Sequence, residues 1–474
     1  MKKLFALLLV CFAVVACFTS CDSEQPPEVT VSGEQLRDYG DIAGDFSFLL
    51  AGNWDFNDFE ADEASEEVVD KAIYERTKTI ESNYGVKIST NNIYESHSST
   101  GSGTGFMKVY SEYSAGTSSY DATFIGAYDV ATLAYNGMLW DLNRIPYIDL
   151  TKDHWDQRAN EDLGIRGKMY YTTGDISLSD NRATYTLFFS KKMVEDFGLA
   201  SPYDLVNNNE WTLEKFAEMT KSVGSDANQD GNYNENDIFG LLTPNDTNLA
   251  ILSAADERIS RINENGEIEL SLYNDRVVRL YDNYNDLIHH TSVLNYQRVS
   301  PSPSSETRIA MLDNNQALFY SHTMFYIDYL RECENDFGIL PYPKLDATQE
   351  NYKNLVSAWH ASFVCIPLMA KNPTRSGAVL EELAILGKEK VTPAYYDKTL
   401  QGKRARDIDS LAMLDIIFDN LVYDIGAYYN IGTYKDELSK LAVSNKSLTT
   451  IYETYKLQAQ NKIDTINANF LKQQ

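Results

Sequence analysis

The sequence predicts an α/β protein built from two lobes. The chain has 474 residues, and a single hydrophobic core seldom grows beyond about 250 to 300 residues, so one globule is not expected. Strand and helix patterns alternate before residues 168–193, and the same alternation starts afresh after them. Within that segment, an apolar-rich strand at 168–173 leads through Gly174 and a polar turn at 179–181 into a second strand at 183–190. We interpret the segment as a passage between two lobes.

Composition excludes several classes of function. A hydrophobic content of 43% with 12% aromatic residues is enough to fill sizeable cores. The net charge of -28 argues against nucleic acid and against broad adhesion to anionic lipid, because both need an excess of Lys and Arg. The 32 Tyr are an unusual number. A surplus of Tyr suits half-buried packing first, and stacking sites for polar ligands with planar faces second.

Residues 1–21 have the pattern of an export signal. Lys2 and Lys3 precede an apolar run that ends at Ala16, which is too short to remain as a membrane-spanning helix. Two cysteines could end the signal: Cys17 follows Val-Val-Ala, whereas Cys21 has the polar run DSEQPP directly behind it. The segment resembles bacterial lipoprotein signals, which implies that one of these thiols carries diacylglycerol and palmitate and tethers the protein to the outer face of the cytoplasmic membrane. Plain secretion is the alternative.

The sequence after residue 21 predicts a polar tether and then a βαβ unit. Residues 22–44 are polar and contain two adjacent prolines, which is typical of extended linker. An apolar strand at 46–51 is followed by a helix that begins after Ser65 and stops at Gly85, and a strand at 86–88 comes next. Ligands bind at the carboxyl ends of such strands. The glycine-rich residues 97–105 lack the Gly-Lys-Ser/Thr of a phosphate loop and indicate a mobile loop instead.

A calcium-loop pattern follows the helix predicted at 213–223, which Thr212 caps. Oxygen-bearing side chains stand at positions 1, 3, 5 and 7, glycine at position 6 and an acid at position 12. Asp replaces the usual Glu at position 12, so its reach is one methylene shorter, and the loop looks most like the dockerin variant. The alternative is an Asn/Asp-rich turn satisfied by water. The predicted ligands of this structural calcium ion are Asp226, Asn228, Asp230, Asn232 and Asp237.

The last elements predicted are a return crossing near residues 359–360, a strand at 363–367, a helix at 376–387 and a final helix. Six apolar and aromatic residues between 452 and 470 share one face of the final helix, which we expect to dock on the second lobe. Beyond the signal, Cys333 and Cys365 remain, and the sequence leaves open whether they pair.

Five stretches resemble the extracellular solute-binding proteins of ABC importers, of the family 1 type with many sugar-binding members. The first two are YDATFIGAYDVATLAYNGMLWDLN at 120–143 and residues 147–193, and the others lie at 203–223, 336–352 and 392–400. The resemblance covers nearly all of the chain from about residue 45 onward. It implies a two-lobed periplasmic-binding-protein-like fold of type II, in which each lobe is a mixed sheet flanked by helices and hinge strands join the lobes.

The same resemblance implies a monomer that is not an enzyme and that delivers its solute to a separate permease and ATPase. The membrane is reached only through the lipid anchor. We expect residues 45–178 plus 360–390 in lobe one and residues 182–356 plus 391–474 in lobe two.

Other functions stay open at this stage. The six His lack the spacing of a metal-peptidase helix, and no Gly-x-Ser-x-Gly elbow is present. A carboxylate pair for glycoside hydrolysis is not excluded, because the separation of two carboxylates is set by the fold. A peptide- or polyamine-binding protein and a surface scaffold are further alternatives.

The predicted solute is a carbohydrate, and an oligosaccharide in particular. Sugars present apolar C–H faces and a rim of hydroxyls, so their sites need aromatic plates with carboxylates and amides at the edge. Each candidate side chain could equally fill a core. The candidate plates are Trp54, Tyr128, Tyr185, Phe325 and Trp359, and the candidate hydrogen-bonding partners are Asp55, Asp175, Asn181 and His360.

Overall fold

The structure, a computed structural model, describes residues 36–52, 57–93, 100–401, 408–441, 443–444 and 446–473. The chain divides into two compact units, residues 1–38 and 39–474, and the description below concerns the second. The predictions for Cys17, Cys21, Trp54 and Asp55 fall outside the described residues.

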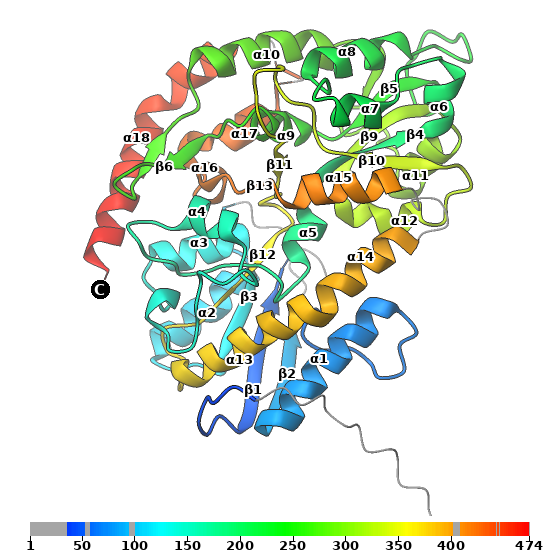
Figure 1. Cartoon of the computed structure of the whole chain (residues 1–474). Coiled ribbons are helices and arrows are strands. Elements are labelled where there is room, and N and C mark those ends of the chain that lie inside the picture. The colour runs from blue at the N-terminus through cyan, green and yellow to red at the C-terminus, as the bar shows by residue number, and fades with distance from the viewer. Residues whose placement is uncertain are drawn as a thin grey trace, which may run out of the picture. The chain divides into compact units, whose positions relative to one another are not determined.

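The first of two mixed sheets has the strand order β12-β3-β1-β2 (Figure 1). Strand β1 lies parallel to β2 and β3, and β12 closes the edge antiparallel to β3. The βαβ unit predicted from the sequence is confirmed, because helix α1 (Val68–Tyr84) connects the parallel strands β1 and β2. The helix ends where Gly85 adopts the left-handed conformation (φ 64°) that favours glycine. The strands are β1 Gly44–Ala51, β2 Val86–Asn92, β3 Ala122–Gly126 and β12 Ser362–Cys365.

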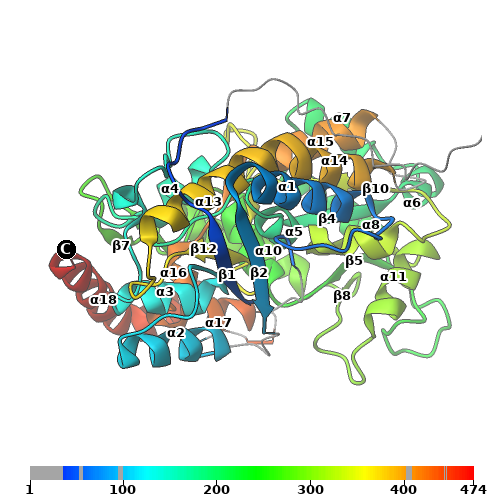
Figure 2. The same cartoon turned by 90° about the horizontal axis from the view of Figure 1, so that it is seen from below.

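Helices cover both faces of this sheet, because side chains along each strand alternate between two cores. Leu49 and Ile125 face the helices α2 and α3, whereas Phe48 and Phe124 face α1 and α13. Figure 2 shows α1 and α13 on one side of β1 and β2, and α2 and α3 on the other. The helices are α1 Val68–Tyr84, α2 Thr104–Ala115, α3 Ala127–Tyr135 and α13 Pro373–Leu386.

The second mixed sheet has the order β10-β4-β9-β5-β8. Strands β8, β5 and β9 run parallel, β4 is antiparallel to β9, and β10 is antiparallel to β4. Phe189 and Phe319 face helix α8 (Leu213–Ser222) on one side. Phe188 faces helices α11 (Ser305–Asp313) and α15 (Ile408–Phe418) on the other. The strands are β4 Tyr185–Ser190, β5 Phe239–Thr243, β8 Val293–Asn295, β9 Ala317–Thr323 and β10 Phe337–Leu340.

The remaining elements are short strands and helices. Two small sheets pair β6 Ser260–Ile262 with β7 Ile268–Leu270, and β11 Asn354–Leu355 with β13 Leu421–Val422. The other helices are α4 Gln157–Leu163, α5 Ser179–Ala183, α6 Lys191–Asp196, α7 Pro202–Asn207, α8 Leu213–Ser222, α9 Thr247–Ala254, α10 Asp275–Ile288, α11 Ser305–Asp313, α12 Ile327–Leu330, α14 Thr392–Gln401, α15 Ile408–Phe418, α16 Ile425–Tyr428, α17 Tyr434–Ser439 and α18 Leu448–Lys472. Short turns of 3₁₀-helix occupy η1 Leu142–Arg144, η2 Met324–Tyr326 and η4 Ile431–Thr433, and η3 Gly387–Val391 is a π-helical turn.

The crossing segment differs from its prediction. Residues 168–173 do not form a strand, and Thr172 makes one antiparallel bridge to Val364. The chain then turns at Gly174 (φ 144°), where a Cβ would lie 2.5 Å from the carbonyl oxygen of His154. The polar turn predicted at 179–181 is wrong, because these residues begin the short helix α5.

A buried ion pair holds α5 against the segment after β1. Arg182 Nη1 lies 2.7 Å from Asp58 Oδ1, and Asp58 Oδ2 accepts the backbone N–H of Leu178 at 2.9 Å. Arg76, which is fully buried, donates to the carbonyl oxygens of Asp58 and Ile176. Burial lowers the pKa of Arg76 to about 10.

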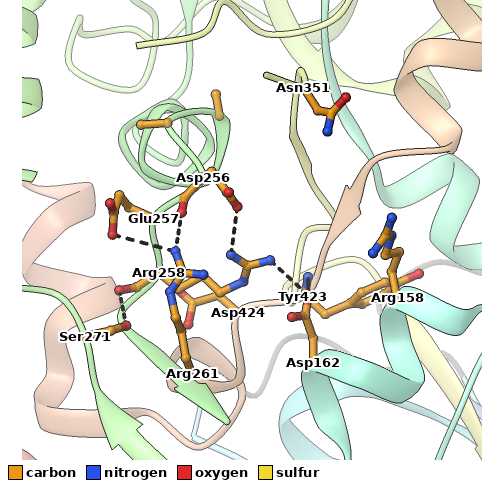
Figure 3. Close-up of polar contacts among 12 residues, drawn as sticks. Arg158, Asp162, Asp256, Glu257, Arg258, Arg261, Ser271, Asn351, Tyr423 and Asp424 are labelled. Carbon is orange, nitrogen blue, oxygen red and sulfur yellow. Dashed lines mark hydrogen bonds and ion pairs between the residues drawn. The ribbon is translucent and has the colours of Figure 1, made fainter. Parts of the chain in front are cut away.

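A polar network joins three distant segments of the chain (Figure 3). Arg258 lies 3.4 Å from Asp162 of α4 and 3.2 Å from Asp256. The same Asp162 Oδ2 accepts the backbone N–H of Tyr423 at 3.0 Å. Asp424 accepts the backbone N–H of Ile259 at 2.8 Å and caps α16. The chain at 421–426 is therefore fixed to both earlier segments.

In the final helix, α18, four of the six residues predicted to share one face are buried, and the other two, Tyr452 and Tyr455, are half-buried; the four are Ala459, Ile463, Ile466 and Phe470. The side chain of Asn467 exchanges hydrogen bonds with the backbone of Ile268 in strand β7. In the part of the chain that the structure describes, no helix is long and apolar enough to cross a membrane. Cys333 and Cys365 are both buried and form no disulfide. The exact lobe boundaries remain a prediction.

Candidate functional site

A cavity of about 690 Å³ lies at one edge of the second sheet. The parallel strands β5, β8 and β9 all end at this edge, since the residues that follow each of them line the cavity. Strand ends of this kind leave side chains and backbone groups free to meet a ligand. The lining residues are Tyr128, Tyr185, Pro244, Asn245, Asp246, Leu249, Tyr296, Gln297, Ser302, Arg308, His322, Phe325, Tyr326, Trp359, His360, Lys435, Asp436, Ser439 and Lys440.

Aromatic rings form much of the wall. Tyr128 comes from the first turn of α3, just after β3 of the first sheet, and Trp359 lies in the segment before β12. The other rings belong to the second sheet or to the turn after it: Tyr185, Tyr296, Phe325 and Tyr326. The cavity is therefore lined by residues that adjoin strands of both sheets.

The charged side chains of the wall are paired within the protein. Arg308 donates to the hydroxyls of Tyr320, Ser305 and Tyr326 and to the carbonyl oxygen of Pro303, at 2.8 to 3.2 Å. Its guanidinium lies 4.2 Å from the ring centroid of Tyr296.

Lys435 Nζ is 2.8 Å from Asp436 Oδ1 and 5.0 Å from the ring centroid of Tyr128. Asp436 thus pairs with the charge of Lys435, whereas Arg308 keeps its charge but spends its hydrogen-bond donors on neutral oxygens, which leaves fewer donors for an anionic ligand.

Asp246 supplies a carboxylate to the wall. It follows β5 by three residues and precedes α9. Ser439 Oγ donates to its Oδ1 at 3.0 Å. Burial raises the pKa of Asp246, and the hydrogen bond from Ser439 and the charge of Lys435 act in the opposite direction. One oxygen of this carboxylate thus accepts from Ser439, and the group can accept further hydrogen bonds from ligand hydroxyls.

Two histidines lie near one another in the cavity. The rings of His322, at the end of β9, and His360 have centroids 6.4 Å apart. His322 Nδ1 is 2.8 Å from the backbone nitrogen of Thr323, and its ring centroid lies 3.6 Å from that of Tyr326. Burial lowers the pKa of His322 well below its ordinary value, with further contributions from His360 and Arg308.

Five of the side chains proposed from the sequence line this cavity together: Tyr128, Tyr185, Phe325, Trp359 and His360. Asp175 and Asn181 do not line it. The Asp175 carboxylate instead accepts a hydrogen bond from Thr392 Oγ1 at 2.6 Å, and Asn181 lies within α5. Trp54 and Asp55 lie outside the described residues.

Sequence reasoning missed other lining residues, among them Asp246, Tyr296, Arg308, His322, Tyr326 and Lys435. A usable signal existed for some of them. Tyr296 directly follows strand β8 and Asp246 comes three residues after β5, so both stand at strand ends, where the sequence predicts binding residues. Lys435 lies on α17, far along the chain, and nothing local marks it.

The predicted calcium loop is folded around its own backbone. Asp226 Oδ2 accepts the N–H of Gly231 at 2.8 Å, where φ is 78°, and Asp230 Oδ1 accepts the N–H of Asn232 at 2.7 Å. The buried Asp237 accepts from Ala227 and Asn234. Among the described residues, no three His, Cys, Asp or Glu side chains gather closely enough to hold a metal ion. Asparagine and backbone oxygens complete such loops, so the calcium ion stays a prediction.

Comparison with solved structures identifies the type of fold. No family model matches the chain, and no curated protein matches it in sequence. Among solved structures, the galacto-N-biose/lacto-N-biose I-binding protein of an ABC transporter of Bifidobacterium longum, in complex with lacto-N-biose, is similar with a TM-score of 0.59 at 10% identity, covering 90% of this chain and 99% of that one.

An ABC substrate-binding protein of Listeria monocytogenes in complex with cycloalternan has a TM-score of 0.56 at 14% identity, covering 90% and 98%. UgpB of Mycobacterium tuberculosis in complex with glycerophosphocholine has a TM-score of 0.54 at 12% identity, covering 89% and 99%. These likenesses, with the two mixed sheets, confirm the predicted two-lobed type II periplasmic-binding-protein fold.

Proposed function

We propose that this protein is an extracellular solute-binding protein that captures a carbohydrate, in particular an oligosaccharide, for an ABC importer. The observation that supports this most strongly is the cavity, which combines six aromatic side chains with hydroxyl, amide and carboxylate groups. An aromatic face covers the C–H face of a sugar, and the polar groups at its edge exchange hydrogen bonds with the hydroxyls.

The charge arrangement favours an uncharged solute. Arg308 and Lys435 are engaged with internal partners, as is Asp246 through Ser439. A phosphate or carboxylate ligand needs cationic donors that are not already used. A polyamine carries several ammonium groups and needs several carboxylates, whereas the lining holds two, Asp246 and Asp436, and Asp436 is already paired with Lys435. The fold alone does not choose the solute, since the same fold holds glycerophosphocholine in UgpB.

The volume of the cavity is large enough for more than one sugar ring. Ligand pockets in proteins commonly measure about 300 to 1,000 Å³, and this cavity measures about 690 Å³. A bound oligosaccharide would contact residues of both sheets and so favour a closed arrangement of the lobes, which shifts an equilibrium between open and closed forms.

The other parts of the proposal follow from this class of protein. The bound sugar would pass to a separate permease and ATPase. The protein would act as a monomer at the outer face of the cytoplasmic membrane, held there by a lipid on Cys17 or Cys21. A calcium ion at Asp226–Asp237 would stabilise the loop between α8 and β5.

Isothermal titration calorimetry with the full chain tests the proposal. The panel is maltotriose, cycloalternan and lacto-N-biose, with glycerophosphocholine, a tripeptide and spermidine as the competing classes. We expect heat from at least one oligosaccharide and no release of a smaller sugar when the mixture is analysed afterwards. Tight binding of the tripeptide or of spermidine, with no binding heat from any sugar, would contradict the carbohydrate assignment. A hydrolysis product would support the glycoside hydrolase alternative.

A further inference from the structure

His322 has one ring nitrogen fixed by the protein and one that faces the cavity. The backbone N–H of Thr323 donates to Nδ1 at 2.8 Å, and the Thr323 hydroxyl lies 3.2 Å from the same atom. A nitrogen that accepts from a backbone N–H cannot carry a proton itself, because two hydrogens would then meet. A neutral imidazole in this arrangement therefore carries its proton on Nε2.

The ring has little freedom to turn away from this arrangement. Tyr326 covers it with a centroid separation of 3.6 Å, and Arg308 Nη2 donates to the Tyr326 hydroxyl at 2.8 Å. Tyr320 lies against it at 5.7 Å. His322 as a whole is 8% exposed, and that exposure opens to the cavity. Among the described residues, Nε2 has no hydrogen-bond partner, yet it is not sealed from solvent.

The surroundings of His322 disfavour the imidazolium. Burial lowers the pKa of His322 most, and His360 from the segment before β12 and Arg308 from α11 lower it further. Tyr320 and Tyr326 lie against the ring, and the wall of the cavity also holds the carboxylate of Asp246, which has its own partner in Ser439. The neutral ring thus persists into mildly acidic solution.

We propose that His322 is a specificity-determining residue, whose Nε2–H donates a hydrogen bond to an uncharged oxygen acceptor, a hydroxyl or ring oxygen, of the bound sugar. The proposal rests on the proposed carbohydrate-binding function. It disfavours cationic amines as solutes, because an ammonium group has no lone pair to accept the Nε2–H and would meet it donor to donor. The Nε2–H donor is present for as long as the ring stays neutral, which its burial favours.

Two measurements test the inference. The first needs no ligand: ¹⁵N NMR of the histidine-labelled full chain reports which ring nitrogen carries the proton. From pH 8 to pH 5 we expect His322 to be the Nε2–H tautomer. Its signals are assigned by their absence from the spectrum of His322→Gln. An Nδ1–H tautomer, or an imidazolium at pH 6, overturns the inference.

The second is calorimetry with whichever of maltotriose, cycloalternan and lacto-N-biose gives the strongest heat with the unmodified chain. His322→Phe keeps a ring but removes the donor, and we expect about 10-fold weaker binding, the size of one neutral hydrogen bond. His322→Gln restores an N–H near the place of Nε2 and should recover most of that loss. His289→Phe, at an exposed histidine that does not line the cavity, is the matched control.

The outcomes separate the two proposals. If the unmodified chain binds a sugar and His322→Phe binds it equally well, the role of His322 is contradicted and the carbohydrate function stands. If affinity falls several-fold between pH 8 and pH 5 in the unmodified chain but not in His322→Gln, the neutral donor is contradicted. If no sugar gives heat, both proposals fail.

Discussion

Removal of the Trp359 ring should weaken sugar binding by about 10-fold. Trp359 is half-buried and lines the cavity. A sugar face laid on it would cover roughly 60 Å², about a quarter of the surface of a Trp side chain. At about 25 cal/mol per Å², that area is worth roughly 1.5 kcal/mol, which corresponds to about 10-fold in Kd.

Calorimetry of Trp359→Ala, Trp359→Phe and the unmodified chain with the same oligosaccharide measures this effect. Trp359→Phe retains a flat apolar face and should lose less than Trp359→Ala. Phe197→Ala, at a 46% exposed ring outside the cavity lining, should bind as the unmodified chain does. The reasoning is refuted if Trp359→Ala keeps its melting temperature and binds the sugar with unchanged affinity.

Three further predictions concern stability. Arg182→Met leaves Asp58 buried without its partner and should cost about 3 to 5 kcal/mol in urea unfolding, whereas Lys192→Met in the exposed pair with Asp196 should cost less than about 0.5 kcal/mol; equal costs would contradict the importance of the buried pair. Burial raises the pKa of Asp424 from 3.8 to about 6, so the folded state holds this proton more tightly than the unfolded chain does. The free energy of unfolding therefore falls as the pH rises from about 4 through 6, and this contribution is constant at higher pH. Between pH 8 and pH 5 the unmodified chain should therefore gain about 1 kcal/mol more stability than Asp424→Asn, and an equal gain would show that Asp424 does not titrate in this range. Chelation with EDTA should lower the melting temperature by about 3 °C or more if calcium binds tightly at Asp226–Asp237, with no response in Asp237→Asn; an unchanged melting temperature, with no calcium by metal analysis, would favour a turn satisfied by its own backbone and by water.

The fold could be predicted largely from local patterns. Gly85 ends α1 in a conformation that disfavours other residues, and Thr212 caps α8 by accepting the N–H of Lys215, so both boundaries are readable from the sequence. The path of the chain between the two sheets, at residues 168–193, could not be predicted from local patterns alone. Residues 168–173 have strand composition, yet close approach of Gly174 to His154 and the ion pair of Arg182 with Asp58 decide the path.

The site could be predicted only in part, for a related reason. Tyr128 and Tyr185 lie at strand ends, and their position along the chain marks them. Asp175 also follows an extended run, but the turn at Gly174 directs its carboxylate to Thr392. His322 and Lys435 reach the cavity through tertiary packing of β9 and α17, which no local spacing records.

A crystal structure of the full chain with the oligosaccharide that gives the strongest calorimetric response tests the central claim most directly. The account predicts sugar density in the 690 Å³ cavity, with a ring face on Trp359 or Phe325 and an oxygen within hydrogen-bond distance of His322 Nε2. Density for the sugar at another place, or an empty cavity at saturating sugar, would contradict it.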